Sequence, residues 1–101
     1  MRDTKTISWI FLAVANASEE APADYKCLIE AADAINHAIP TNRELQDSID
    51  WLLRNDLILI EESKYALSKT GSRLLLYSKG KTKTFRETLD KLNVKLQTDY
   101  D

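Results

Sequence analysis

The chain contains few of the residues on which covalent or metal chemistry depends. Its 101 residues include one cysteine and one histidine, together with two glycines and two prolines. A single cysteine, Cys27, excludes a disulfide within the chain and a zinc site built from several cysteines, and it fits a reducing compartment. We expect Cys27 to be a buried apolar filler and the protein to be cytoplasmic. Glycine and proline most disfavour helix interiors, so their scarcity indicates a largely helical domain.

The sequence also lacks a hydrophobic run long enough to cross a membrane. The longest apolar stretch near its start, residues 7–15, is interrupted by Ser8, whereas a membrane-spanning helix needs about 20 residues. We therefore expect neither export nor a membrane anchor. One domain is expected at this length, and a chain so short buries a small share of its surface. Pairing as a homodimer through an exposed apolar helix would add stability.

Positive charge is scarce in the first half of the chain and concentrated in the second. The net charge is −2, but residues 1–50 hold 4 basic and 9 acidic side chains, whereas residues 51–101 hold 10 and 7. Residues 64–86 contain seven lysines and arginines and no acid. This basic tract would attract phosphate through its local potential. A solvated helix end followed by a linker would have the same composition.

Two helices are predicted in the first 36 residues. Apolar residues recur at helical spacing within residues 4–17, which predicts an amphipathic first helix with Trp9 at its edge. After a polar break, Asp24 is a suitable N-cap for a second helix that ends near Asn36. Pro40 then disfavours helical geometry at the residue before it, so residues 37–40 form a turn. The predicted inward residues of the second helix are Tyr25, Leu28, Ile29, Ala32 and Ile35.

A capping box marks the start of a third helix. The hydroxyl of Thr41 can accept from an unpaired backbone amide. The carboxylate of Glu44, three residues later, can accept from the backbone amide of Thr41. Asn55 and Asp56 are suitable residues to end this helix. Its inward stripe is Leu45, Ile49, Leu52 and Leu53, and the residues left facing outward are Asn42, Arg43, Gln46, Asp47 and Asp50.

A β-hairpin and two further helices complete the prediction. Residues 57–62 and 65–67 form the strands, with Ser63 and Lys64 as the tight connection. Ser68 can cap a fourth helix that runs through Tyr77, in which Gly71 permits close backbone packing. A second capping box at residues 84–87 opens the last helix. We predict that its apolar stripe packs on the first helix, on a second subunit, or on both. The stripe is Phe85, Leu89, Leu92 and Leu96.

Two segments together resemble bacterial winged-helix regulators of the MarR and PadR type. They are the spacing Ile49-x-x-Leu52-x-x-x-x-Leu57-Ile58 and the run Tyr65-x-Leu67-Ser68-x-x-Gly71-x-x-Leu74. The resemblance covers about residues 25–76, with Asp56 where glycine is usual and Ser68 where threonine is usual. It implies a mainly α fold with a small β-hairpin, a winged helix-turn-helix with an additional C-terminal helix. Residues 1–78 would form the winged-helix domain, and residues 79–101 a basic linker and an amphipathic helix of the same compact unit.

The resemblance implies a non-catalytic, dimeric DNA-binding regulator of transcription that needs no cofactor and no metal. The third helix would enter the major groove with its first residues. Arg43 would contact guanine and Asn42 or Gln46 adenine, while Thr41 would donate to a phosphate. Lys64 would lie at the tip of the wing. Further phosphate contacts would come from Lys79, Lys81 and Lys83.

Other interpretations of the same residues remain open. The third helix carries more acid than base on its outer face, which repels phosphate and favours a winged helix that binds a protein. Trp9 and Trp51 are core or interface residues, or they line a small-ligand cleft beside the first helix. Catalysis would need Cys27 to pair with His37 across a helix, and Glu30, Asp33 and Glu44 lack the spacing of a metal site.

Overall fold

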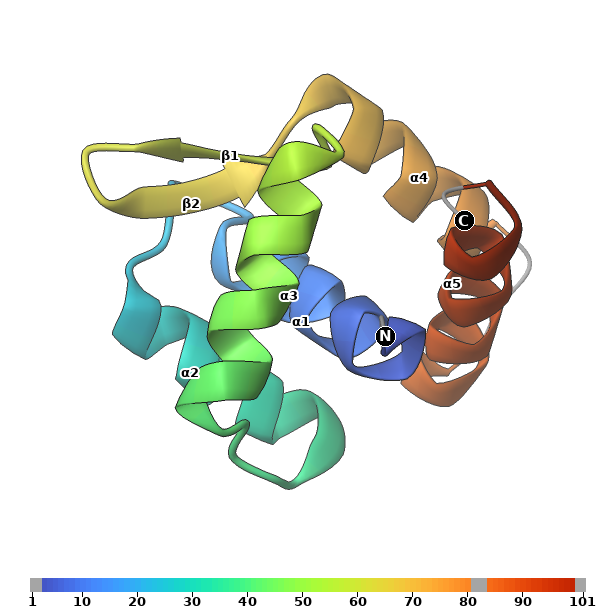
Figure 1. Ribbon diagram of the computed structural model, residues 1–101, viewed down its shortest axis with the longest axis horizontal. Helices are drawn as coiled ribbons and strands as arrows, with labels where there is room; N and C mark the ends of the chain where they lie inside the picture. Colours follow the sequence, from blue (N-terminus) through green and yellow to red (C-terminus); the bar gives the residue numbers. More distant parts are fainter. Residues whose placement is uncertain (1–2, 81–83, 100–101) are drawn as a thin grey trace.

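The computed structural model describes residues 3–80 and 84–99, and the fold class predicted from the sequence is confirmed (Figure 1). Three helices come first: α1 (Thr4–Ala17), α2 (Tyr25–Asn36) and α3 (Asn42–Arg54). A hairpin of β1 (Ile58–Glu61) and β2 (Lys64–Leu67) follows. Two more helices, α4 (Lys69–Lys79) and α5 (Phe85–Asp99), complete the chain. The architecture is a winged helix with an additional C-terminal helix.

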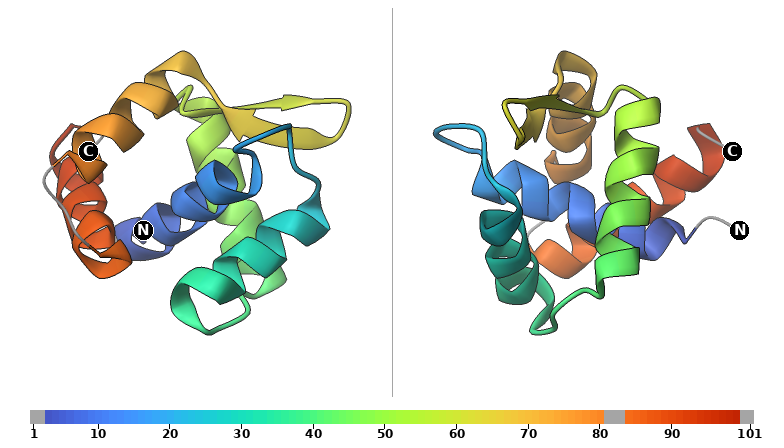
Figure 2. Two further views of the ribbon diagram at one scale, coloured as in Figure 1. Left: turned by 180° about the vertical axis from the view of Figure 1, so that it is seen from behind. Right: turned by 60° about the vertical axis from the view of Figure 1, so that its left-hand side comes forward.

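Helix α1 lies at the centre of the molecule and packs against α2, α3 and α5 (Figure 2). We predicted an amphipathic helix, but every residue from 7 to 15 is buried. The reason is that three helices cover it, so little of its circumference faces water. Trp9, predicted at the edge, is 8% exposed, and its indole Nε1 donates to the carbonyl of Ala32 at 2.9 Å. This bond ties α1 to α2.

The helix starts predicted from capping residues are confirmed. Asp24 accepts from the amide of Cys27 at 2.9 Å, and Thr41 and Glu44 form both halves of the capping box, at 3.0 and 2.9 Å. Ser68 accepts from the amide of Gly71 at 2.9 Å. Helix α4 runs to Lys79, two residues beyond the predicted end. Capping depends on residues within one turn, which is why these starts could be located from sequence.

The hairpin connection differs from the predicted one by a residue. Glu62 and Ser63 form the turn, both with positive φ (52° and 65°), and Lys64 pairs with Glu61 inside the ladder. Positive φ at both central residues is the geometry of the two-residue turns that match the twist of a hairpin. Tyr65 also exchanges two backbone hydrogen bonds of 2.8 Å with Ala23. That contact with the segment before α2 joins residues far apart in the chain and is not visible in the local sequence.

The exit of α3 adopts the left-handed conformation that its position requires. Asp56 has a φ of 58°, although glycine is more usual at such a site. The carbonyl of Asp56 accepts from the hydroxyl of Ser68 at 2.5 Å, and that of Leu57 accepts from the Ser68 amide at 3.2 Å. The chain therefore leaves α3 and enters α4 at one shared point beside the hairpin.

Helix α5 packs on its own chain. Leu92 and Leu96 have no exposed surface, and Leu89 is partly buried against the same core. Thr4 of α1 donates to the side chain of Asn93 and accepts from Gln97 at 3.2 Å. Of the two predicted partners for this stripe, the first helix is thus confirmed for Leu92 and Leu96. Dimerisation through the stripe stays a prediction, and the side chain of Phe85 lies outside the described residues.

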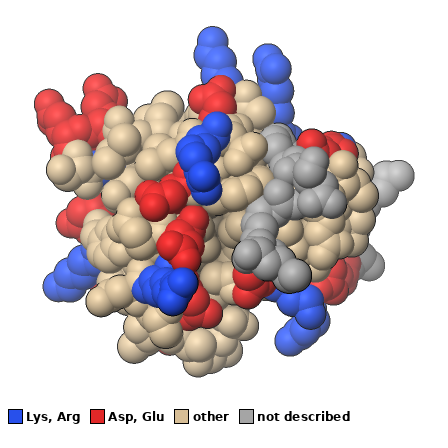
Figure 3. All heavy atoms as spheres, in the orientation of Figure 1, with Lys and Arg blue, Asp and Glu red and all other residues tan. Residues whose placement is uncertain are grey.

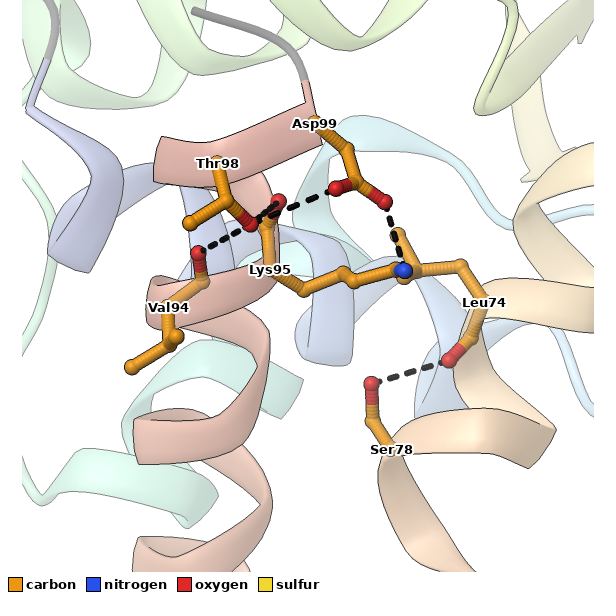
Figure 4. Close-up of polar contacts among 6 residues, drawn as sticks. All are labelled: Leu74, Ser78, Val94, Lys95, Thr98 and Asp99. Atoms are coloured by element: carbon orange, nitrogen blue, oxygen red, sulfur yellow. Dashed lines mark hydrogen bonds and ion pairs between the residues drawn. The ribbon is translucent and has the colours of Figure 1, made fainter.

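The outer sides of α4 and α5 meet through an aromatic ring and two lysines. Lys91 and Lys95 each place Nζ 4.7 Å from the centre of the Tyr77 ring. Lys95 also pairs with Asp99 at 2.5 Å, next to the hydroxyl of Thr98 (Figure 4). In α4, the hydroxyl of Ser78 donates a hydrogen bond of 2.9 Å to the carbonyl of Leu74 (Figure 4). The Tyr77 ring, which is 52% exposed, thus joins α4 to α5 through the two lysines.

Two predictions about individual features can be compared with the structure. Cys27 is exposed, so its prediction as a buried filler is wrong. It lies in the first turn of α2, off the stripe that faces α1, so its apolar side chain is not enough to bury it.

No helix in the described part of the chain is long and apolar enough to cross a membrane.

Candidate nucleic-acid interface on α3

The outward side of α3 carries the residues predicted to contact bases. Asn42, Arg43 and Gln46 are exposed on its first two turns, together with Asp47 and Asp50. They face outward because Leu45, Ile49 and Leu52 fill the core side of the helix and have almost no exposed surface. Figure 1 shows α3 at the front of the molecule, so this side is open to a partner.

Arg43 is paired with an acid on its own helix. Its Nε lies 3.7 Å from Oδ2 of Asp47 one turn later, and the two side chains are 91% and 70% exposed. Exposed pairs at this spacing stabilise a helix by only about 0.3–0.5 kcal/mol. The guanidinium is therefore held loosely and can be taken up by a stronger acceptor.

Gln46 likewise contacts an acid one turn later on the same helix, Asp50. Its Nε2 donates to Oδ1 of Asp50 at 2.9 Å, and the backbone carbonyl of Asp50 accepts from Nε of Arg54 at 3.4 Å. The two outward acids thus each lie beside a predicted base-contacting side chain. With Glu44, three carboxylates share this helix with two arginines, and phosphate meets a slightly negative surface.

The N-terminal end of α3 is held by its capping box. The Thr41 oxygen accepts from the Glu44 amide, and the Glu44 carboxylate accepts from the Thr41 amide. The hydrogen of the Thr41 hydroxyl is left to donate outward. Because the helix dipole is positive at this end, an anion placed there is stabilised.

The predicted DNA-binding residues lie in three places. Thr41, Asn42, Arg43 and Gln46 lie in the half of α3 nearest α2, whereas the hairpin lies at the other end of α3 (Figure 1). Lys64 follows the hairpin turn, which contains Glu62, and pairs with Glu61 in the ladder. Lys79 ends α4 near α5, at the opposite end of the molecule from the hairpin (Figures 1 and 2). Lys81 and Lys83 lie outside the described residues.

The charge pattern of the surface agrees with the separation of the predicted DNA-binding residues into three places. On the face shown in Figure 3, basic and acidic side chains alternate over the middle of the molecule, where α3 lies, and the blue atoms do not form a continuous area there. Lys69 and Arg73, both exposed on α4, add positive charge outside α3. Phosphate contacts would thus come from the surroundings of α3 more than from α3 itself.

A cleft beside α3 was only partly foreseen from the sequence. Trp51, predicted as a possible cleft residue, lines it with Asp3 and other residues at the start of α1, whereas Ser48 and Arg54, which also line it, were missed. The signal for it was weak: Ser48 stands at an inward position of the stripe formed by Leu45, Ile49 and Leu52, where an apolar residue is expected. The partner residues of α1 lie some 40 positions earlier, so sequence spacing could not join them.

The catalytic and metal hypotheses receive no geometric support from the described residues. Cys27 and His37 lie at opposite ends of α2, about 15 Å apart along a helix that rises 1.5 Å per residue. The pKa of Cys27 is raised, mainly by its hydrogen bond with Asp24, which disfavours the thiolate. Within residues 3–80 and 84–99, no three His, Cys, Asp or Glu side chains are grouped so as to hold a metal ion.

Comparison with known proteins gives no family for this chain. No protein-family model, no curated protein and no solved structure matches it.

Proposed function

We propose that this protein is a non-catalytic DNA-binding regulator in which α3 is the recognition helix. The observation that carries the proposal is the exposure of Asn42, Arg43 and Gln46 on the first two turns of a capped helix, with Arg43 91% exposed. These are the residue types that make two-point contacts with guanine and adenine in the major groove. In helix-turn-helix proteins the first turns of the recognition helix make such contacts.

The contacts within α3 are weak enough to be exchanged for contacts with bases. The pair between Arg43 and Asp47 contributes about 0.3–0.5 kcal/mol, whereas a two-point contact between arginine and guanine provides about 1–3 kcal/mol of discrimination. Asp47 can in turn accept from the amino group of cytosine. An adjacent guanine and cytosine would therefore engage both side chains.

The acids on α3 determine what kind of DNA binding is expected. Attraction to phosphate supplies nearly all of non-specific affinity, and it is weak where carboxylates outnumber arginines. Lys64 on the hairpin and Lys69, Arg73 and Lys79 on α4 are exposed bases outside α3 that could contact phosphate. We therefore expect low affinity for random DNA and a larger than usual dependence on sequence. As a homodimer, the protein would recognise two half-sites about 34 Å apart.

Selection from a random duplex pool at low salt tests this proposal. We expect a recovered motif that contains guanine next to cytosine, and fluorescence anisotropy should show that Arg43→Ala weakens binding to it by at least tenfold. Lys26→Ala, which removes an exposed base of α2, is the control and should bind normally. Recovery of no motif, or equal weakening by both variants, would contradict recognition by α3.

Docking of a protein is the second candidate function, and two observations favour it. The outer face of α3 has the acids Glu44, Asp47 and Asp50, which would attract a basic segment. On the hairpin, Leu59 and Ile60 are 41% and 50% exposed, and apolar side chains of this kind occur at binding surfaces. In the selection experiment this alternative predicts that no duplex is enriched.

A further inference from the structure

Asp50 holds the side-chain amide of a neighbouring residue on the outward side of α3. Nε2 of Gln46 donates to Oδ1 of Asp50 at 2.9 Å, across one turn of the helix. Both residues are exposed, on the face that the proposed function turns toward the bases. Within residues 3–80 and 84–99, the side-chain amide of Gln46 makes no other hydrogen bond. Its carbonyl oxygen and its second N–H are therefore left for a partner.

The chemistry of the carboxylate determines which end of the amide it binds. An ionised carboxylate has acceptor atoms only, so it binds the amino end of an amide and not the carbonyl end. The bond to Asp50 therefore disfavours the flipped amide of Gln46, whereas a glutamine without this neighbour presents either end. In water such a bond is a modest bias. It strengthens where a partner excludes water, because a hydrogen bond to a charged group is stronger at low dielectric.

The orientation of the amide decides which purine it contacts at two points. In the major groove adenine presents the N7 acceptor and the N6 amino donor, whereas guanine presents two acceptors, N7 and O6. The held amide of Gln46 offers one donor and one acceptor, which match adenine. Against guanine its carbonyl oxygen would meet O6, and two acceptors repel. To bind guanine at two points, the amide would have to flip and break its bond with Asp50.

Asn42, the other residue predicted to contact adenine, lacks such a neighbour. It is the first residue of α3, and its side chain makes no hydrogen bond in the described part of the chain. Its amide is therefore free to present either end. Arg43, which carries only donors, suits the two acceptors of guanine and lies beside Asp47. The two outward acids thus accompany side chains that suit different purines.

We propose that Asp50 is a positioning residue that makes Gln46 select adenine over guanine. This role rests on the proposed function, because it assigns one base of the DNA site that α3 contacts. Asp50 acts through the amide of Gln46 and does not need to touch the purine. A carboxylate that weakens attraction to phosphate thereby adds to sequence specificity.

The ratio of affinities for adenine and guanine at one position is the readout. Selection with the wild type and with Gln46→Ala locates that position, as the adenine whose preference the variant loses. Fluorescence anisotropy with duplexes that carry adenine or guanine there then gives the ratio. Asp50→Ala should lower it about threefold to tenfold, the effect of one hydrogen bond. A ratio is needed because loss of a carboxylate raises affinity for every duplex.

Two further variants separate the position of the amide from the loss of charge. Asp50→Asn removes the same charge but keeps an oxygen that accepts from Nε2 of Gln46, so it should retain most of the ratio. Glu30→Ala removes an exposed carboxylate of α2 and should leave the ratio unchanged. In the Gln46→Ala background, Asp50→Ala should have no effect on the ratio, because the amide that it positions is gone.

The outcomes distinguish failure of this role from failure of the proposed function. If the wild type selects no motif, the proposed function fails and the role of Asp50 fails with it. If a motif is selected but no adenine in it depends on Gln46, only the role is overturned. The same holds if Asp50→Ala leaves the ratio unchanged, or lowers it equally with and without Gln46.

Discussion

Gly71 and Leu57 approach so closely that a Cβ built on Gly71 would lie 1.9 Å from the carbonyl oxygen of Leu57. The same carbonyl accepts from the amide of Ser68, so the first turn of α4 rests on the backbone that leaves α3. Only glycine permits this approach. It fixes the direction in which α4 leaves the hairpin and, with it, the position of α5 on α1.

Replacing Gly71 with alanine should destabilise the fold. The added methyl group meets backbone atoms that cannot rotate away, and overpacking of this kind costs about 1–3 kcal/mol or more. Urea denaturation would measure the loss of unfolding free energy. Gly80→Ala is the matched control, since its Cβ would lie 3.5 Å from the nearest atoms, an ordinary contact. Equal stability of the two variants would show that the approach is not rigid.

Replacing Asp56 with glycine should have the opposite effect. Asp56 has a φ of 58°, which costs an L residue free energy and costs glycine none, so we expect stabilisation by about 0.5–1 kcal/mol. Thermal unfolding would detect it as a higher midpoint. The neighbouring Asn55 has a φ of −96° and donates to the carbonyl of Trp51, so Asn55→Gly should instead lower the midpoint. The interpretation fails if both glycines act in the same direction.

Acid should weaken the fold through its capping aspartates. Hydrogen bonds from Thr6 and Cys27 lower the pKa values of Asp3 and Asp24 below the ordinary 3.8. A lowered pKa in the folded state adds stability above pH 3.8, and this contribution is lost as the pH falls through the folded-state value. The double variant Asp3→Asn with Asp24→Asn keeps the capping oxygens but cannot titrate. Denaturation at neutral and acidic pH should show a smaller loss for the variant than for the wild type, and equal losses would contradict this.

The sequence was most informative where structure is local. The starts of α2, α3 and α4 follow from Asp24, Thr41 and Ser68, because a cap acts within a single turn. Contacts between distant segments could not be predicted: Ala23 bridges to Tyr65 across some 40 residues, and three helices bury α1 on nearly every side. The α3 face was predicted because helical spacing fixes which residues point outward. Of the cleft, only Trp51 was predicted as a possible lining residue, because its walls come from two segments far apart in the chain.

Binding of the purified protein to a mixed-sequence duplex, followed by fluorescence anisotropy from low to physiological salt, shows whether this winged helix binds DNA at all. We expect binding at low salt that weakens as salt rises. We also expect a shallower dependence for Lys79→Ala with Lys81→Ala and Lys83→Ala, by roughly 0.9 in logarithmic slope for each phosphate contact removed. Absence of binding even at the lowest salt would contradict the claim that this winged helix binds DNA.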